Sequence, residues 1–239
     1  MLYAITWPVM KAFMRLLFAL LGGFRKAGVS NIPSTGGVLF CPNHISDADP
    51  AAVAVALPRS AYFMAKEEIF AVPIVGKLVA HFRGFPVKRN RADRSALRRA
   101  EELLKAGQAV VIFPEGGGNE VGTLQPLNPG ALMIALRTKT PVVPVALTNT
   151  NKVWKYGALF PRRAGVPVTV TFGEPLDFSD LYGKKGAVEA ATQRLTATLA
   201  QMLGQPAPVG KPQNRSDENN EEAGKEMREA SSPSGAVAA

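Results

Sequence analysis

The chain has 239 residues, of which 46% are hydrophobic, a normal value for a globular protein. Its one cysteine, Cys41, excludes an internal disulfide framework and a cysteine-rich metal site, and it fits a reducing compartment. The formal net charge is +9, but residues 1–204 carry 24 Lys and Arg against 13 Asp and Glu, which makes that part more basic than the whole. A basic body indicates an anionic partner, such as a membrane surface, a phosphorylated substrate, a nucleotide-bearing cofactor or nucleic acid.

Residues 2–24 are apolar enough to span a bilayer if their charges are ignored. Lys11 and Arg15 lie four residues apart on one helical face, and the remaining surface is apolar and aromatic. This pattern is typical of a helix that lies in the membrane interface, and Pro8 is expected to break its first turn. A membrane span, a core helix and a signal peptide are the alternatives. Burial of the two charges disfavours a core helix, and the poor cleavage site at residues 22–25 disfavours a signal peptide.

From residue 30 to residue 172, short apolar runs alternate with helical stretches. Strands are predicted at residues 38–41, 62–64, 85–87, 109–113, 142–147 and 168–172. Helices are predicted at residues 50–56, 75–81, 93–106, 130–139 and 188–203. This alternation predicts an α/β fold with a mostly parallel sheet flanked by helices.

Three segments are expected along the chain. Residues 1–27 are the N-terminal membrane-associating helix, and residues 28–204 form the α/β domain. Residues 205–239 are rich in Pro, Glu, Asn and Ser and nearly lack large apolar side chains, which predicts a disordered tail.

The first group of candidate catalytic residues follows the strand predicted at residues 38–41. His44 comes directly after it, and the carboxyl ends of parallel strands are where ligands bind. Histidine is suited to accept a proton near neutral pH, and a carboxylate on its other ring nitrogen orients the ring. Asp49 stands five residues on, where a turn brings it within reach. Asp49 is alternatively only the N-cap of a helix that begins at Pro50, and Asp47 is an alternative partner.

A second candidate is the segment 113–116, Phe-Pro-Glu-Gly, where a buried strand ends abruptly. Glycine allows backbone N–H groups to approach an anion closely. Glu115 is placed to bind a substrate hydroxyl or to anchor a basic residue. The alternative is a plain strand exit with a solvated carboxylate.

Together these segments resemble the glycerophospholipid acyltransferase family, which includes 1-acyl-glycerol-3-phosphate acyltransferases. The resemblance covers roughly residues 28–180 and rests on four motifs in order. They are Asn-His-x-x-x-x-Asp at residues 43–49, a segment ending in Arg at 84–89, Phe-Pro-Glu-Gly at 113–116 and a proline–valine strand at 141–145.

The resemblance implies that residues 28–204 are an acyltransferase domain in which His44 deprotonates an acceptor hydroxyl and Asp49 orients the imidazole. The hydroxyl would attack an acyl thioester, and a backbone N–H would stabilise the oxyanion. A rival reading makes Cys41 the nucleophile of a Cys–His pair. The substrate-binding residues that the resemblance implies are Asn43, Lys88, Arg89, Glu115 and Gly116, with Arg89 as the phosphate contact.

Three departures from the family pattern concern the acceptor. Lys88 replaces an Asp that relatives often carry, and Gly117, Gly118 and Asn119 stand where relatives usually have Thr-Arg-Ser. Leu127 and Asn128 replace Phe-Lys. Two cationic positions are thereby lost, so the expected acceptor is 1-acyl-glycerol-3-phosphate or another lyso-lipid.

The expected partners are a membrane lipid surface, a lyso-lipid acceptor and an acyl-CoA or acyl-carrier-protein donor. No cofactor or metal is expected beyond the donor as co-substrate, because one of the two histidines is already assigned. Nucleic acid is not expected, because aromatic residues are not interleaved with the Arg-rich stretch 83–99. The expected location is the cytoplasmic face of the inner membrane. The competing class is a basic membrane-binding protein without catalysis.

Overall fold

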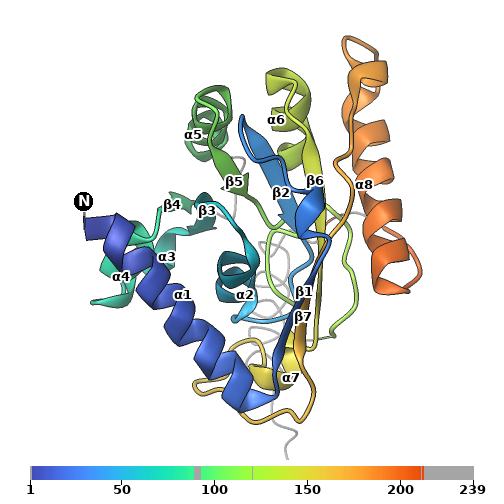
Figure 1. Ribbon diagram of the computed structural model, residues 1–239. Helices are drawn as coiled ribbons and strands as arrows, with labels where there is room; N and C mark the ends of the chain where they lie inside the picture. Colours follow the sequence, from blue (N-terminus) through green and yellow to red (C-terminus); the bar gives the residue numbers. More distant parts are fainter. Residues whose placement is uncertain (1, 89–92, 120, 211, 213–239) are drawn as a thin grey trace, which may run out of the picture.

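The computed structural model describes residues 2–88, 93–119, 121–210 and 212. Its centre is a seven-stranded sheet in the order β1-β7-β6-β2-β5-β3-β4 (Figure 1). The strands are β1 (Phe24–Ala27), β2 (Val38–Pro42), β3 (Ala61–Lys66), β4 (Gly84–Val87), β5 (Ala109–Val111), β6 (Val142–Thr148) and β7 (Val168–Phe172). All neighbouring pairs run parallel except β6 and β7, so the predicted mostly parallel α/β fold is confirmed.

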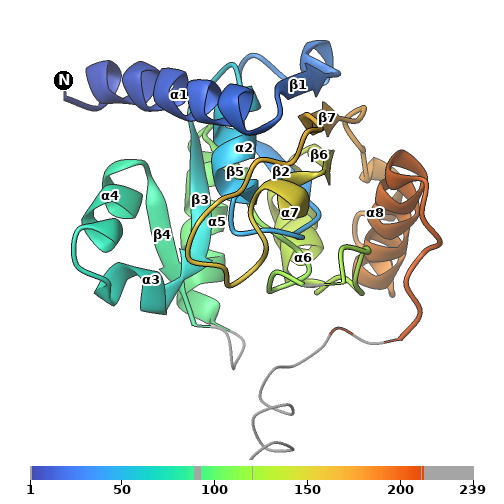
Figure 2. The same ribbon diagram turned by 90° about the horizontal axis from the view of Figure 1, so that it is seen from below.

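The helices are α1 (Leu2–Leu21), α2 (Asp49–Ala56), α3 (Glu67–Ala71), α4 (Val75–His81), α5 (Arg94–Lys105), α6 (Gly130–Thr138), α7 (Thr150–Val153) and α8 (Ala187–Leu203). Helices α1 and α2 lie on one side of the sheet, and α5, α6 and α8 lie on the other (Figure 2). The five helices predicted after residue 30 are all present with ends within one residue of the prediction, whereas the N-terminal helix expected over residues 1–27 already ends at Leu21. The short helices α3 and α7 were not predicted, because neither is long enough to show helical periodicity.

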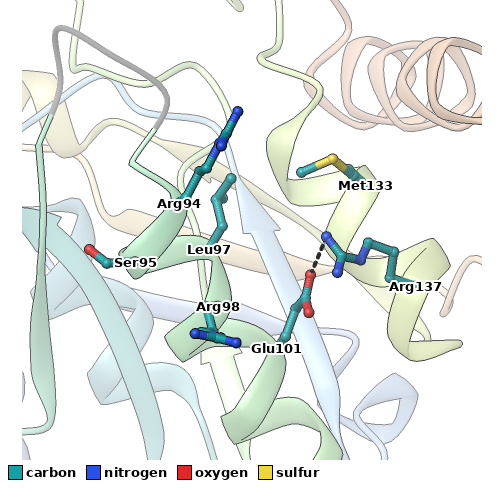
Figure 3. A pocket seen from close by; sticks show the side chains of 7 residues that line it. All are labelled: Arg94, Ser95, Leu97, Arg98, Glu101, Met133 and Arg137. Carbon is teal, nitrogen blue, oxygen red and sulfur yellow. Dashed lines mark ion pairs between the residues drawn. The ribbon is translucent and has the colours of Figure 1, made fainter.

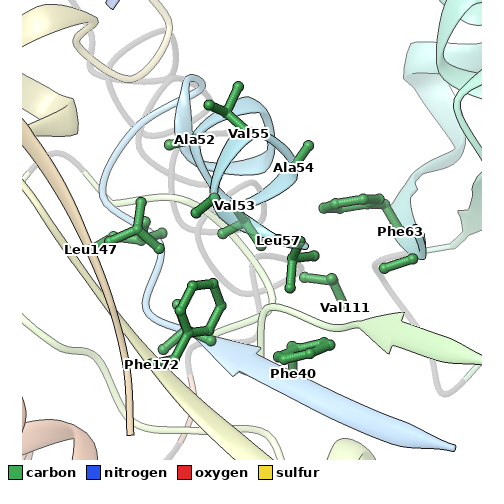
Figure 4. Packing of buried hydrophobic residues seen from close by; sticks show 14 of the residues in the cluster. Phe40, Ala52, Val53, Ala54, Val55, Leu57, Phe63, Val111, Leu147 and Phe172 are labelled. Atoms are coloured by element: carbon green, nitrogen blue, oxygen red, sulfur yellow. The ribbon is translucent and has the colours of Figure 1, made fainter. Parts of the chain in front are cut away.

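The central strand β2 divides the core into two layers. Val38 and Phe40 face α2, where Phe40 meets Phe172 edge to face with ring centroids 6.0 Å apart (Figure 4). Leu39 and Cys41 face the opposite layer beneath α5, α6 and α8. Alternate strand residues point to opposite faces, so a fully apolar run is what a strand covered on both sides requires.

Strand β1 was not predicted, and it joins the N-terminal segment to the sheet. It pairs with β7 in parallel from Phe24 opposite Val168 to Ala27 opposite Thr171. Most of its residues are exposed, so its sequence lacks the apolar signal of a buried strand. Charged side chains are common on edge strands, where they discourage pairing with other chains. The domain boundary predicted after residue 27 therefore leaves β1, a strand of the main sheet, in the N-terminal segment.

Helix α1 corrects two expectations about the N-terminus. It runs through Pro8 without a break, since Pro8 and Ala4 are exposed and water can bond to the Ala4 carbonyl that lacks an N–H partner. Lys11 does not form an exposed stripe with Arg15, because its ammonium donates a 2.5 Å hydrogen bond to the Leu57 carbonyl. Burial is the main cause that lowers the pKa of Lys11, and the nearby charges of Lys26 and Arg15 add to it.

The last helix ends at Leu203, with Gly204 in the left-handed conformation as its C-cap. Gln205, the first residue of the predicted tail, is still tied to the domain because its Oε1 accepts a 2.8 Å hydrogen bond from Leu124 N–H. Residue 211 and residues 213–239, the greater part of that tail, lie outside the described residues.

Candidate active site

His44 and Asp49 lie together at the carboxyl end of β2. The Nδ1 of His44 is 2.9 Å from Oδ2 of Asp49, and the Asp49 side chain is completely buried. The same oxygen accepts hydrogen bonds from the backbone N–H groups of Ile45 (2.7 Å) and Ser46 (2.8 Å). Three donors on one buried oxygen hold the carboxylate in place, so the ring of His44 has a set orientation.

The structure decides among the alternatives for Asp49. Helix α2 begins at Asp49, and its N-cap is Ala48, one residue earlier than a capping role for Asp49 requires. The carboxylate bonds to the preceding loop and to His44, and no N–H of α2 donates to it among the hydrogen bonds of the described residues. Asp47 turns away and accepts a 2.7 Å hydrogen bond from Gly157 N–H. Asp49 is therefore the partner of His44.

The His44 ring rests on an aromatic surface and keeps one nitrogen available. Its centroid is 4.3 Å from that of Phe113 and 6.2 Å from that of Tyr156, which meets it edge-on. The side chain is 11% exposed, and Nε2 has no hydrogen bond to any residue in the described part of the chain. A buried ring with one nitrogen anchored by a carboxylate and the other unbonded within the described residues is the geometry of a general base.

Cys41 is not placed to act as a nucleophile. Its side chain is fully buried in the layer beneath α5, α6 and α8. Burial raises the pKa of the thiol, which disfavours the reactive thiolate. The structure thus argues against the Cys–His reading.

Asn43 fixes the ends of two strands. Its Nδ2 donates to the Leu147 carbonyl (3.1 Å), and its Oδ1 accepts from Leu147 N–H (2.7 Å). The residue is 1% exposed, so both polar groups are used inside the protein. We therefore interpret Asn43 as a residue that positions the His44 loop on β6, and the substrate contact implied by the family resemblance stays a prediction.

Glu115 also supports the His44 loop from inside. Its Oε1 accepts from His44 N–H (2.8 Å), and its Oε2 accepts from Asn119 Nδ2 (2.9 Å). Asn128 donates through Nδ2 to the Glu115 carbonyl (3.2 Å). Gly116 has a φ of +78°, and its N–H donates a hydrogen bond to the Phe113 carbonyl. It therefore allows the sharp turn that the chain makes after the strand. With both oxygens of its carboxyl group occupied in this way, Glu115 anchors the His44 loop, a role that the sequence did not predict.

The comparisons with known proteins agree with this geometry. A family model described as Acyltransferase matches residues 23–148, more than half of the chain. The chain belongs to the Acyltransferase family. Similar proteins include the 1-acyl-sn-glycerol-3-phosphate acyltransferases of Cocos nucifera (31% identical, 70% of this chain and 54% of the relative) and Bacillus subtilis (strain 168) (29%, 76% and 91%). The chain thus spans about half the length of the Cocos nucifera relative.

A solved structure shares the fold of this member of the family. It is the 1-acyl-sn-glycerophosphate (LPA) acyltransferase PlsC from Thermotoga maritima. The TM-score is 0.69 at 25% sequence identity, and the match covers 84% of this chain and 80% of that one. The expected resemblance to the glycerophospholipid acyltransferases is therefore confirmed.

The predicted phosphate contact Arg89 lies outside the described residues, as does Arg91. Lys88 is described, and its ammonium is 3.8 Å from a Glu67 carboxylate oxygen, with both side chains about half exposed. An ion pair as exposed as this one contributes little to stability. The Lys88 ammonium is therefore accessible to an anion.

Tyr156 is a residue near His44 that the sequence did not single out. Its ring lies against Gly118: a Cβ added to Gly118 would stand 2.1 Å from the ring. The Tyr156 loop is held to the His44 loop by the Ser46 hydroxyl, which donates to the Trp154 carbonyl, and by the Asp47 bond to Gly157. In this chain, the glycine at position 118 thus makes room for an aromatic ring beside His44.

The buried carboxyl of Glu115 predicts a pH dependence of stability. Burial raises its pKa from 4.5 to about 8, and the hydrogen bonds from His44 and Asn119 oppose that rise. Between these pH values the unfolded chain has released a proton that the folded chain keeps. The free energy of unfolding therefore falls as pH rises, by about 1 kcal/mol per pH unit.

Replacing Glu115 with Gln should remove this dependence. Urea unfolding of the wild type and Glu115→Gln in one detergent at pH 5, 6.5 and 8 measures it. The wild type should lose stability relative to the variant as pH rises. Glu102→Gln, which changes the exposed partner of Arg99, should follow the wild type. Parallel curves for wild type and Glu115→Gln would contradict the raised pKa.

Proposed function

We propose that this chain is an O-acyltransferase that moves a fatty acyl group from a thioester to the hydroxyl of a lyso-lipid, most specifically 1-acyl-glycerol-3-phosphate. The observation that carries the proposal is the buried contact of 2.9 Å between His44 and Asp49, with Nε2 directed away from the carboxylate. The names of the relatives supply the acceptor class.

The geometry supports a direct transfer. The acceptor hydroxyl gives its proton to Nε2 of His44 as its oxygen bonds to the thioester carbon, and the carbonyl becomes a tetrahedral oxyanion. Asp49 stabilises the imidazolium that forms. Collapse of the oxyanion breaks the carbon–sulfur bond, and the proton passes from the imidazolium to the departing thiolate. The products are the acylated lipid and a free thiol, with no covalent enzyme intermediate.

The test is release of thiol from an acyl thioester by the full chain in detergent, followed with and without acceptors. We expect release that requires a lyso-lipid, with 1-acyl-glycerol-3-phosphate first among a panel that varies the head group. The glycines at positions 117 and 118 favour a second candidate, a lyso-lipid with another head group, because neither brings a cation to the loop after Glu115. Acylation of a non-lipid alcohol alone would contradict both. No transfer from acyl-CoA or from acyl-carrier protein would favour the non-catalytic membrane-binding protein.

We further propose that α1 lies in the membrane interface. Among the described helices it is the one with the length and hydropathy to cross a membrane, and only 6% of the relevant window is buried. Its exposed face carries large apolar side chains about one turn apart, namely Ile5, Val9, Phe13, Leu16 and Leu20. The opposite face packs on the domain through Trp7, Met10 and Met14. If α1 crossed the membrane, the face with Trp7, Met10 and Met14 would lose its packing on the domain. A helix that lies in the interface keeps this packing and places the other face in the bilayer.

The basic body supports contact with an anionic leaflet, and we place the protein at the cytoplasmic face of the inner membrane on that ground. Phe13→Glu should reduce partition onto anionic vesicles by about tenfold to a hundredfold, because it withdraws one large apolar side chain from the bilayer. Sedimentation with vesicles measures this.

The control for Phe13→Glu is Val209→Glu, which places the same charge on an apolar residue that is 97% exposed outside α1. It should bind vesicles like the wild type. Equal binding by Phe13→Glu and the wild type would exclude the exposed face of α1 as the membrane contact.

A further inference from the structure

A groove of about 600 Å³ lies between α5 and α6, separate from the His44 loop (Figure 3). Its walls combine guanidinium groups with apolar side chains, contributed chiefly by Arg94, Leu97, Arg98, Glu101, Met133 and Arg137. Leu97 and Met133 face each other across it, and Arg94 stands at one end (Figure 3). A concave surface of this size and mixed chemistry suits one small-molecule moiety.

Of the three arginines that line the groove, one is paired with a carboxylate and two are not, among the described residues. Arg137 is paired with Glu101 at 3.1 Å, and the Glu101 side chain is only 10% exposed, which holds that guanidinium at the groove wall. Arg94 and Arg98 are exposed and have no ion pair with any carboxylate in the described part of the chain. They are one helical turn apart, about 6 Å along the axis. Two such guanidinium groups suit the paired recognition of phosphate oxygens.

The α6 wall of the groove is connected along the chain to the segment that supports His44. Asn128 donates to the carbonyl of Glu115, whose carboxylate accepts from His44 N–H. The next residue, Pro129, is the N-cap of α6, and Met133 lies one turn further on, with its N–H donating to the Pro129 carbonyl. The groove wall at α6 thus starts two residues after Asn128, which holds the Glu115 segment beside His44.

We propose that the α5–α6 groove binds the phosphorylated nucleotide end of acyl-CoA. This rests on the proposed acyl-transfer function and specifies its donor. Arg94 and Arg98 contact the phosphates, and the apolar strip of Leu97 and Met133 packs against the base. The flexible pantetheine arm then carries the thioester to His44. A folded acidic carrier protein presents a broad convex surface, whereas a groove with two unpaired guanidinium groups matches a nucleotide better.

The experiment compares two donors that deliver the same acyl group, acyl-CoA and the acyl thioester of N-acetylcysteamine, which lacks the nucleotide and its phosphates. The double variant Arg94→Ala/Arg98→Ala should raise KM for acyl-CoA about tenfold or more, because it removes charge-assisted contacts. Its KM and kcat with the short thioester should match those of the wild type. Added salt should weaken use of acyl-CoA by the wild type more than by the variant.

The matched control is Arg99→Ala, which removes the same charge from α5 at a residue that pairs with Glu102 (3.5 Å) and does not line the groove. It should leave KM for acyl-CoA unchanged. If Arg99→Ala raised KM for acyl-CoA as much as the double variant does, the effect would come from general surface charge, and the proposal would be overturned. An equal loss with both thioesters in the double variant would overturn it as well.

Calorimetric titration with CoA separates this proposal from the proposed function, because it needs no chemistry. CoA binding by the wild type that is lost in Arg94→Ala/Arg98→Ala supports the groove even if no acceptor is acylated. If acyl-carrier protein is the donor used and CoA does not bind, the groove proposal fails while the acyl-transfer function stands.

Discussion

His44→Ala should reduce kcat/KM for acceptor-dependent thiol release by about 10²–10⁴-fold, the range that a positioned general base contributes. The variant removes the nitrogen that takes the acceptor proton. The fold should persist, because the bond from residue 44 to Glu115 is made by its backbone N–H and survives the substitution.

The matched control is His81→Ala, which changes the other histidine of the chain. His81 contacts the Thr6 hydroxyl through Nε2 at 2.7 Å, between α4 and α1. Its loss should leave kcat within a few-fold of the wild type. Full activity in His44→Ala, or an equal loss in both variants, would sink the assignment of His44 as the base.

Asp49→Asn should lower kcat by about 10²–10⁴-fold and change KM little, since an amide cannot stabilise the imidazolium that forms during transfer. An amide oxygen can still accept from the N–H groups of Ile45 and Ser46, so the turn between His44 and α2 should hold. Steady-state kinetics and a thermal unfolding scan of each variant provide the measurement.

Asp47→Asn is the control for Asp49→Asn. Its carboxylate is exposed and accepts from Gly157 N–H, which an amide oxygen also does. It should keep most of the activity. A larger loss in Asp47→Asn than in Asp49→Asn would reverse the assignment of the His44 partner.

The contacts that the sequence missed share one property: they join residues that are far apart along the chain. Glu115 is 71 residues from His44, and Asn43 bonds to Leu147 across 104 residues. Asn119 and Asn128 were noticed only as departures from a family pattern. Asparagine after a glycine-rich turn is a signal of side-chain bonds to the backbone, and this signal could have indicated the role of Asn119 beside Glu115.

Local features were determined by the sequence alone. The all-apolar runs at β2 and β6 predict strands covered on both faces, because no polar residue interrupts either side. The five-residue interval between His44 and Asp49 is short enough for one turn to close, so spacing made their contact possible while it left Asp47 and a capping role open. The start of α5 was predicted to within one residue, and in the structure the Asp93 side chain caps it by accepting from the N–H groups of Ser95 and Ala96.

Only the tertiary structure decided how these local pieces face one another. It made β7 antiparallel to β6, turned Lys11 toward the Leu57 carbonyl and brought Tyr156 over Gly118. It also turned Glu115 inward, where its side chain accepts a hydrogen bond from His44 N–H. A sequence pattern shows how burial alternates along one helix or strand. It does not show which distant backbone group forms the hydrogen bond with a buried carboxyl or amide side chain. That choice is made when packing removes water and every buried polar atom must find a partner inside the protein.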